Sequence, residues 1–284
     1  MKNNISPHII TLTTEPEVNK QTSERVLVDL TECEKIAVIG DIHGTLKFIE
    51  GYEHILKYND DVSKIVVLGD HFDPYGSVDF ETMVERYNTF ISCVKMDDRI
   101  VSILGNHDLS KYIIESDETS RSSKDEYEIE TIGNLISENL KDSRLMFVVG
   151  NCIFSHAGVS YDWVNMVTSK GYDFKKLCKK GWSVDELCSI VSYYDYDFSG
   201  WGNHPNQGPT WIRPTMLAKY PYGDFRQVVG HTMMCFEENR KFCFKNTEFD
   251  CVLDNCFYRT TMSNEKDLWF VDNAGDSKYF IITI

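Results

Sequence analysis

The chain has little that would tie it to a membrane or to a disulfide framework. No apolar run approaches the roughly 18 residues that a membrane-spanning helix requires, and the amino terminus lacks the basic and apolar stretches of a signal peptide. The nine cysteines are scattered, odd in number and without a C-x-x-C pair, which argues against disulfides, a zinc knuckle or a redox centre. We therefore expect a cytoplasmic protein with no membrane partner.

Basic residues are also scarce. Lys and Arg number 29 against 44 Asp and Glu, and the formal charge of −15 argues against duplex nucleic acid as a partner. Internal repeats and low-complexity blocks are absent too, while 42% of the 284 residues are hydrophobic, enough for a sizeable core. We expect one large domain over residues 33–284, preceded by an extension or edge strand over residues 1–32.

Three short apolar runs each end in glycine and an oxygen-bearing side chain. They are residues 36–39 before Gly40-Asp41, residues 65–68 before Gly69-Asp70, and residues 100–104 before Gly105-Asn106. Helical periodicity follows the first two runs, and this alternation predicts an α/β fold. The carboxyl ends of neighbouring strands are where such sheets build their sites.

Further strand-like segments lie in the second half of the chain. They cover residues 145–149, 152–154, 227–229, 268–272 and 279–284. Gly150-Asn151 predicts a hairpin between the first two, and Ser183-Val-Asp-Glu186 is a capping box that predicts the start of a helix. We expect the later strands to form a second sheet, largely from the second half of the chain.

Five short motifs carry the polar side chains that follow these strands. They are Gly40-Asp41-Ile42-His43-Gly44, Gly69-Asp70-His71-Phe72-Asp73, Gly105-Asn106-His107-Asp108, His156-Ala157-Gly158 and Gly230-His231-Thr232. Carboxylates, an amide oxygen and imidazoles suit Mn²⁺, Fe or Zn²⁺ rather than a thiolate site. No Walker A motif is present, and no phosphoenzyme intermediate is indicated.

In this order, the motifs resemble those of the calcineurin-like metallophosphoesterases, and within them the serine/threonine phosphoprotein phosphatase branch with its bacterial and phage relatives. The resemblance runs from about Ile36 to Thr232. It implies an α/β fold of two mixed sheets in a sandwich flanked by helices. It also implies a centre of two divalent metal ions. Mn²⁺ is the favoured metal, and Fe and Zn²⁺ are the alternatives.

The resemblance assigns roles to individual residues. Asp41, His43 and Asp70 would hold one ion, and Asp70, Asn106, His156 and His231 would hold the other, with Asp70 bridging. His107 would give a proton to the leaving oxygen, and Asp108 would fix the tautomer of His107. Asn106 would also face the substrate phosphate. Asp73 has two open roles, as a partner of a neighbouring backbone group or of His107.

Two positions depart from the family pattern. Pro74 stands where the phosphoprotein phosphatases have an arginine that contacts phosphate, and we expect Arg213 to bind the phosphate instead. Gly230-His231-Thr232-Met233 lacks the second histidine of the G-H-x-H ending found in many diester-cleaving relatives. This ending resembles the phosphoprotein phosphatase branch, and it leaves the first ion with fewer protein ligands.

The resemblance implies a metal-dependent phosphoesterase that hydrolyses phosphomonoesters through a hydroxide bridging two metal ions. Its favoured substrate is phosphoserine or phosphothreonine in a protein. The alternative is a hydrolase of diadenosine polyphosphates or other nucleotides. A third hypothesis, from another class, is a scaffold that retains the fold without the chemistry. Such a scaffold would have lost some of the metal-ligand residues, whereas all six expected ligand residues are present.

Overall fold

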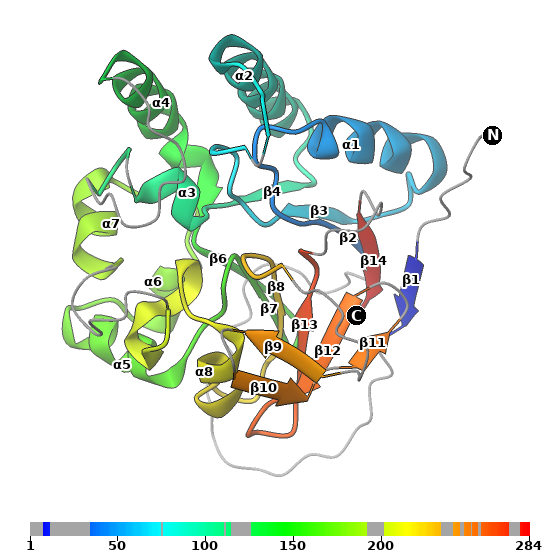
Figure 1. Cartoon of the computed structure of the whole chain (residues 1–284), viewed down its shortest axis with the longest axis vertical. Helices are drawn as coiled ribbons and strands as arrows, with labels where there is room; N and C mark the ends of the chain where they lie inside the picture. Colours follow the sequence, from blue (N-terminus) through cyan, green and yellow to red (C-terminus); the bar gives the residue numbers. More distant parts are fainter. Residues whose placement is uncertain are drawn as a thin grey trace.

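Two six-stranded sheets face each other in the computed structural model of the chain, with helices around them (Figure 1). The structure describes residues 8–11, 35–74, 76–110, 112–114, 126–191, 202–233, 241–244, 247–250, 252–254, 257–272 and 279–284. Of the segment expected to be an extension or edge strand, residues 1–32, only residues 8–11 are among them. None of the helices in the described part of the chain is long and apolar enough to cross a membrane.

The first sheet has the strand order β1-β14-β2-β3-β4-β5. These strands are β1 (His8–Thr11), β14 (Phe280–Thr283), β2 (Lys35–Ile39), β3 (Lys64–Val67), β4 (Ile100–Ile103) and β5 (Ser143–Arg144). From β2 to β5 all neighbours are parallel, whereas β14 runs antiparallel to β2. The almost entirely apolar sequences of β2, β3 and β4 fit strands buried on both faces of a parallel sheet.

The second sheet has the order β11-β12-β13-β8-β7-β6. The strands are β11 (Val252–Asp254), β12 (Phe257–Thr261), β13 (Asp267–Phe270), β8 (Arg226–Val229), β7 (Cys152–Ser155) and β6 (Met146–Val149). The hairpin at Gly150-Asn151 joins β6 to β7, as predicted. A separate ribbon pairs β9 (Lys241–Phe244) with β10 (Thr247–Asp250).

One strand of the second half lies elsewhere than expected. Residues 280–283 form β14 in the first sheet, so the prediction that they belong to the second sheet is wrong. The reason is burial on both faces. Phe280 and Ile282 belong to the apolar cluster between the sheets, whereas Ile281 packs in the cluster beneath the helices. A strand with three consecutive buried apolar residues, 280–282, fits an interior position between β1 and β2.

Three apolar clusters hold the layers together. Alternate residues of the two sheets, such as Val38, Leu68, Phe154 and Trp269, meet between them. The helices of the first half are α1 (Lys47–Tyr58), α2 (Phe80–Met96), α3 (Asn106–Leu109) and α4 (Glu126–Asn139). Buried side chains of α1, α2 and α4 pack on the other face of the first sheet.

The remaining α-helices lie between β7 and β8 along the chain (Figure 1). They are α5 (Tyr161–Ser169), α6 (Phe174–Leu177), α7 (Val184–Ile190) and α8 (Pro214–Lys219). The structure also contains the 3₁₀ turns η2 (Leu140–Asp142) and η3 (Pro205–Thr210). The capping box predicted at Ser183 begins α7, with Glu186 as its second member. The fold is therefore the predicted α/β sandwich of two mixed sheets flanked by helices.

Candidate metal centre

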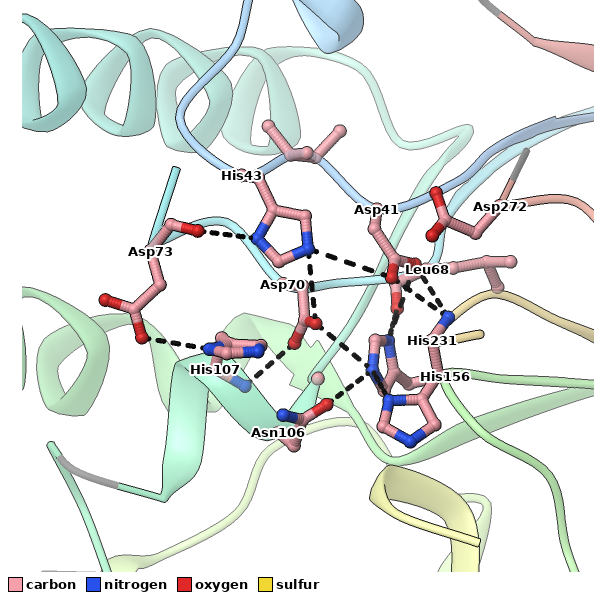
Figure 2. A network of polar contacts seen from close by, with 12 residues as sticks. Asp41, His43, Leu68, Asp70, Asp73, Asn106, His107, His156, His231 and Asp272 are labelled. Atoms are coloured by element: carbon pink, nitrogen blue, oxygen red, sulfur yellow. Dashed lines mark hydrogen bonds and ion pairs between the residues drawn. The ribbon is translucent and has the colours of Figure 1, made fainter. Parts of the chain in front are cut away.

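Five strands deliver polar side chains to one edge of the sandwich (Figure 2). Asp41 follows β2, Asp70 follows β3, Asn106 opens α3 after β4, His156 follows β7, and His231 follows β8. Within each sheet these strands are parallel, so their carboxyl ends lie at the same edge. All five side chains are buried. The structure thus brings together every residue that the sequence placed in the metal centre, including His43.

The backbone is strained at this edge. Among the described residues, five that are not glycine have positive φ angles: His43 (47°), Asp70 (50°), Asp73 (59°), His231 (62°) and Glu265 (65°). Four of the five lie in the site, and such clustering is typical of functional positions. Glycine is required beside them, because a Cβ at Gly105 would lie 2.1 Å from Asp70 Oδ1, and one at Gly230 would lie 2.1 Å from Asp41 Oδ1.

The first ligand group contains Asp41, His43 and Asp70, whose candidate ligand atoms lie within 4.8 Å of one another. His43 Nδ1 lies 3.0 Å from the carbonyl oxygen of Phe72 and 2.9 Å from that of Asp73. Because carbonyl oxygens only accept, Nδ1 carries the proton and Nε2 keeps a lone pair. That lone pair faces the carboxylates, at 3.6 Å from Asp70 Oδ2 and 4.0 Å from Asp41 Oδ2.

The second ligand group contains Asp70, Asn106, His156 and His231. His156 Nδ1 donates to the carbonyl oxygen of Leu68 at 2.8 Å, so Nε2 is again the atom with the lone pair. Nε2 faces Asn106 Oδ1 at 2.9 Å, His231 Nδ1 at 3.1 Å and Asp70 Oδ2 at 3.4 Å. Oxygen and nitrogen atoms of four side chains therefore converge at this point. This donor set fits a divalent cation.

Burial shifts the pKa values of these residues toward their neutral forms. It raises the pKa of Asp70 well above its usual range, and the charges of Asp41 and Asp108 add to this effect. Burial also raises the pKa of Asp41 to about 6, although Lys47 opposes it. Burial lowers the pKa of His156 to about 4. A bound cation would stabilise the ionised form of the carboxylates, and the neutral imidazoles could coordinate it.

The pKa of His231 is lowered as well, like that of His156. Burial lowers its pKa well below the usual value, and the nearby positive charge of Arg213 and the other imidazoles lower it further. Its backbone N–H donates to both oxygens of Asp41, at 3.0 and 2.9 Å, which ties the end of β8 to the end of β2. The two sheets are thus joined at the site by a hydrogen bond between two of the candidate ligands.

The partner of His107 is a correction to the sequence analysis. The structure places Asp73, rather than Asp108, against the ring, with His107 Nδ1 2.9 Å from Asp73 Oδ2. The Asp108 carboxylate instead accepts the backbone N–H groups of Gly105, Asp70 and His71, at 2.8, 3.0 and 2.7 Å. The bond from Gly105 forms because Asp108 lies in the first turn of α3, where a carboxylate turns back to the amide that precedes the helix. The amides of Asp70 and His71, which follow β3, donate to the same carboxylate. Of the two roles open for Asp73, the structure supports contact with His107.

The sequence model of the calcineurin-like phosphoesterases matches residues 34–283. The chain belongs to this family. It is therefore a phosphoesterase, of a family that works with two metal ions. A comparison with curated proteins finds no match.

Solved structures similar to this phosphoesterase include three proteins of 13–15% sequence identity. A cold-active protein-tyrosine phosphatase of a psychrophilic Shewanella species is 15% identical, with a TM-score of 0.43 over 93% of this chain and 82% of that one. A protein serine/threonine phosphatase from Saccharomyces cerevisiae is 14% identical, with a TM-score of 0.41 over 89% and 80%. A putative diadenosine tetraphosphatase is 13% identical, with a TM-score of 0.34 over 95% and 100%.

Arg213 of this phosphoesterase lies beside the second ligand group. It precedes α8, and its Nη1 donates to Thr232 Oγ1 at 3.1 Å. Its guanidinium lies 5.1 Å from the ring centroid of Trp211, and that ring lies 5.2 Å from the ring of His231. A permanent positive charge therefore lies next to a candidate ligand. It comes from a residue distant in the sequence from Pro74, where the phosphoprotein phosphatases have their arginine.

Asp272 is a buried carboxylate of the site that the sequence analysis missed. Its side chain lies beside that of Asp41 (Figure 2), and Lys47 Nζ lies 3.5 Å from its Oδ1. Burial and the charge of Asp41 raise its pKa to about 7. The signal was present in the sequence, because Asp272 directly follows the apolar residues 268–271 at the end of β13, just as Asp41 follows β2.

Proposed function

We propose that this phosphoesterase hydrolyses phosphomonoesters, with phosphoserine and phosphothreonine in proteins as its substrates. The observation that carries the proposal is the pair of ligand groups that share Asp70, with His107 held beside them by Asp73. The motif Gly230-His231-Thr232-Met233 lacks the second histidine of many diester-cleaving relatives, which supports a monoester as the substrate.

The proposed ligands follow from the two groups. Asp41, His43 and Asp70 would hold one cation, and Asp70, Asn106, His156 and His231 would hold the other. Their mixture of carboxylate, amide and imidazole atoms favours Mn²⁺, with Fe and Zn²⁺ as alternatives. When bound, two such cations lower the pKa of a water molecule and neutralise charge on the phosphoryl oxygens.

Substrate phosphate has two proposed partners on the protein. Arg213 can offer two parallel N–H groups to phosphate oxygens, and it already stands beside the second ligand group. Asn106 presents its oxygen to His156, while its Nδ2 is buried and has no hydrogen-bond partner within the described part of the chain. A buried amide N–H without a partner is costly, and a phosphoryl oxygen would satisfy it.

His107 is the proposed proton donor. Because Asp73 accepts the proton of Nδ1, the opposite ring atom, Nε2, is the one that can give a proton to the leaving alkoxide. The Asp73 carboxylate thereby fixes the tautomer and the orientation of the ring. The ring of His107 lies edge-on to that of His43, with centroids 5.2 Å apart, which places it beside the first ligand group.

A substrate screen tests the proposal. The protein is stripped with EDTA, reloaded in turn with Mn²⁺, Zn²⁺ or Mg²⁺, and offered phosphoserine and phosphothreonine peptides, diadenosine tetraphosphate and cyclic nucleotides. We expect the highest kcat/KM on phosphopeptides with Mn²⁺. His156→Asn should lose activity and metal, whereas His54→Asn, on α1, serves as the matched histidine control.

Two outcomes would contradict the proposal. A kcat/KM at least tenfold higher for diadenosine tetraphosphate would favour the nucleotide hydrolase. Hydrolysis of none of these compounds by protein that carries two ions would favour the scaffold that retains the fold without the chemistry.

A further inference from the structure

We propose that Tyr112 is a positioning residue for proton donation by His107, and that it acts through Asp73. The proposal rests on the proposed function, because it takes His107 as the proton donor. It adds a residue that lies outside all five sequence motifs and has no assigned role.

Asp73 contacts three other buried residues in the described part of the chain. Its Oδ2 lies 2.9 Å from His107 Nδ1, and its Oδ1 accepts the hydroxyl of Tyr112 at 3.0 Å. Its carbonyl oxygen lies 2.9 Å from Nδ1 of His43, a candidate ligand (Figure 2). All four residues are buried, with Tyr112 only 8% exposed. One residue thus orients both a proposed metal ligand and the proposed proton donor.

The position of the Asp73 carboxylate needs an external restraint. Its backbone has a φ of 59°, a conformation that costs an ordinary residue about 1 kcal/mol or more. The terminal torsion of an aspartate side chain is broad, so the carboxylate can rotate about its last bond. With a separate partner on each oxygen, Tyr112 on Oδ1 and His107 on Oδ2, this rotation would break two hydrogen bonds at once.

Tyr112 is itself held firmly. It follows α3, the helix that opens with Asn106 and His107, and its ring packs against Phe72 with centroids 5.8 Å apart. Burial and the charge of Asp73 raise the pKa of its hydroxyl, which therefore stays protonated and able to donate. The hydroxyl and the imidazole that it serves are thus carried by one short segment, so their separation is set by local structure.

Tyr112→Phe removes the hydroxyl and keeps the ring. Oδ1 of Asp73 then loses a hydrogen bond in a buried setting, and the carboxylate no longer fixes the ring of His107. We expect kcat on a phosphoserine peptide to fall about 10-fold, with KM within twofold of wild type. On p-nitrophenyl phosphate, whose leaving group departs without a proton, kcat should stay within twofold. Two metal ions per chain should be retained.

Tyr87→Phe is the matched control. Tyr87 of α2 is also buried. Its ring packs against Phe72, the residue that Tyr112 also contacts, with centroids 4.7 Å apart. No hydrogen bond joins its hydroxyl to Asp73 in the described structure. Both substrates should therefore be turned over by this variant as by wild type.

A spectroscopic readout separates positioning from packing. In protein loaded with diamagnetic Mg²⁺ or Zn²⁺, the Nδ1 proton of His107 should give a downfield ¹H resonance that His107→Asn abolishes. Tyr112→Phe should shift this resonance upfield or broaden it, whereas Tyr87→Phe should leave it in place.

Three results decide the matter. Selective loss on the phosphopeptide together with the altered resonance supports the proposal. Equal rates for Tyr112→Phe and wild type, or an equal loss on both substrates with an unchanged resonance, would overturn it while the proposed function stands. If His107→Asn itself slows both substrates by the same factor, the proton-donor role fails, and the proposal on Tyr112 fails with it.

Discussion

Replacing Asp272 by asparagine should stabilise the metal-free protein. Burial raises the pKa of Asp272 to about 7 from an ordinary value of 3.8, so the folded protein resists ionising it more than the unfolded chain does. The stability that the neutral carboxyl contributes is present in full below about pH 4 and is lost as the pH rises through 7. Asp272→Asn keeps the shape of the side chain and removes this ionisation.

The size of the effect follows from the pKa difference. Each pKa unit corresponds to about 1.4 kcal/mol, so ionised Asp272 lowers the free energy of unfolding by about 4 kcal/mol at pH 8 and by about 1.5 kcal/mol at pH 5. The variant also loses the contact with Lys47, whose side chain is 20% exposed, at a cost of under about 1 kcal/mol. The net gain in the variant should therefore be about 3 kcal/mol at pH 8 and about 1 kcal/mol at pH 5.

Urea unfolding in EDTA measures this gain. With an m-value of about 3 kcal/mol/M, the midpoint should rise by about 1 M at pH 8 and by about 0.3 M at pH 5. Asp98→Asn, at an exposed position, is the matched control and should leave the midpoint unchanged. Adding Mn²⁺ should narrow the gap at pH 8, because a cation next to Asp41 compensates the charge of Asp272. An unchanged or lower midpoint for Asp272→Asn at pH 8 without metal would refute the reasoning.

Three further changes test the site and its scaffold. Asp70→Asn removes a charge that both ligand groups share, so bound metal should fall below two ions per chain and kcat by about 10³-fold or more; metal analysis showing two ions with normal turnover would contradict it. Arg213→Ala should lower kcat/KM on a phosphopeptide by about 30- to 1000-fold with metal retained, and unchanged kinetics would assign the phosphate to another cation. Gly158→Ala puts a Cβ 2.1 Å from Leu217 Cδ2 on a backbone with φ of 121°. The free energy of unfolding should drop by about 2–4 kcal/mol, and a smaller loss in urea unfolding would show that Leu217 moves aside.

The strand ends could be predicted because they depend on local sequence. Buried parallel strands are near-continuous apolar runs, and the glycine that closes each one marks the turn where a ligand follows. This is why Asp41, Asp70 and Asn106 were found at one edge. The capping box at Ser183 is equally local, since both of its hydrogen bonds lie within four residues. The apolar residues 268–271 directly before Asp272 are a similar local signal, although no glycine stands between them and Asp272.

What could not be predicted depends on neighbours distant in the sequence. Asp108 is adjacent to His107 along the chain, yet the partner in space is Asp73, 34 positions earlier. The choice is decided by the left-handed backbone of Asp73 and by the backbone amides of Gly105, Asp70 and His71, which hold Asp108. Neither is visible in residue types. The place of β14 could not be predicted for a similar reason, because a run of apolar residues predicts a strand but does not identify the neighbouring strand.

The position of β14 has a consequence for how the protein is made. Val38 of β2 pairs with Phe280, about 240 positions later along the chain. During synthesis, β2 therefore leaves the ribosome long before its neighbour on one side exists. Such distant pairing slows folding, and an apolar strand with an open edge invites association with other chains. Nascent chains should thus be most prone to aggregation at the strand that leads into Asp41, until residues 280–283 have emerged to cover it.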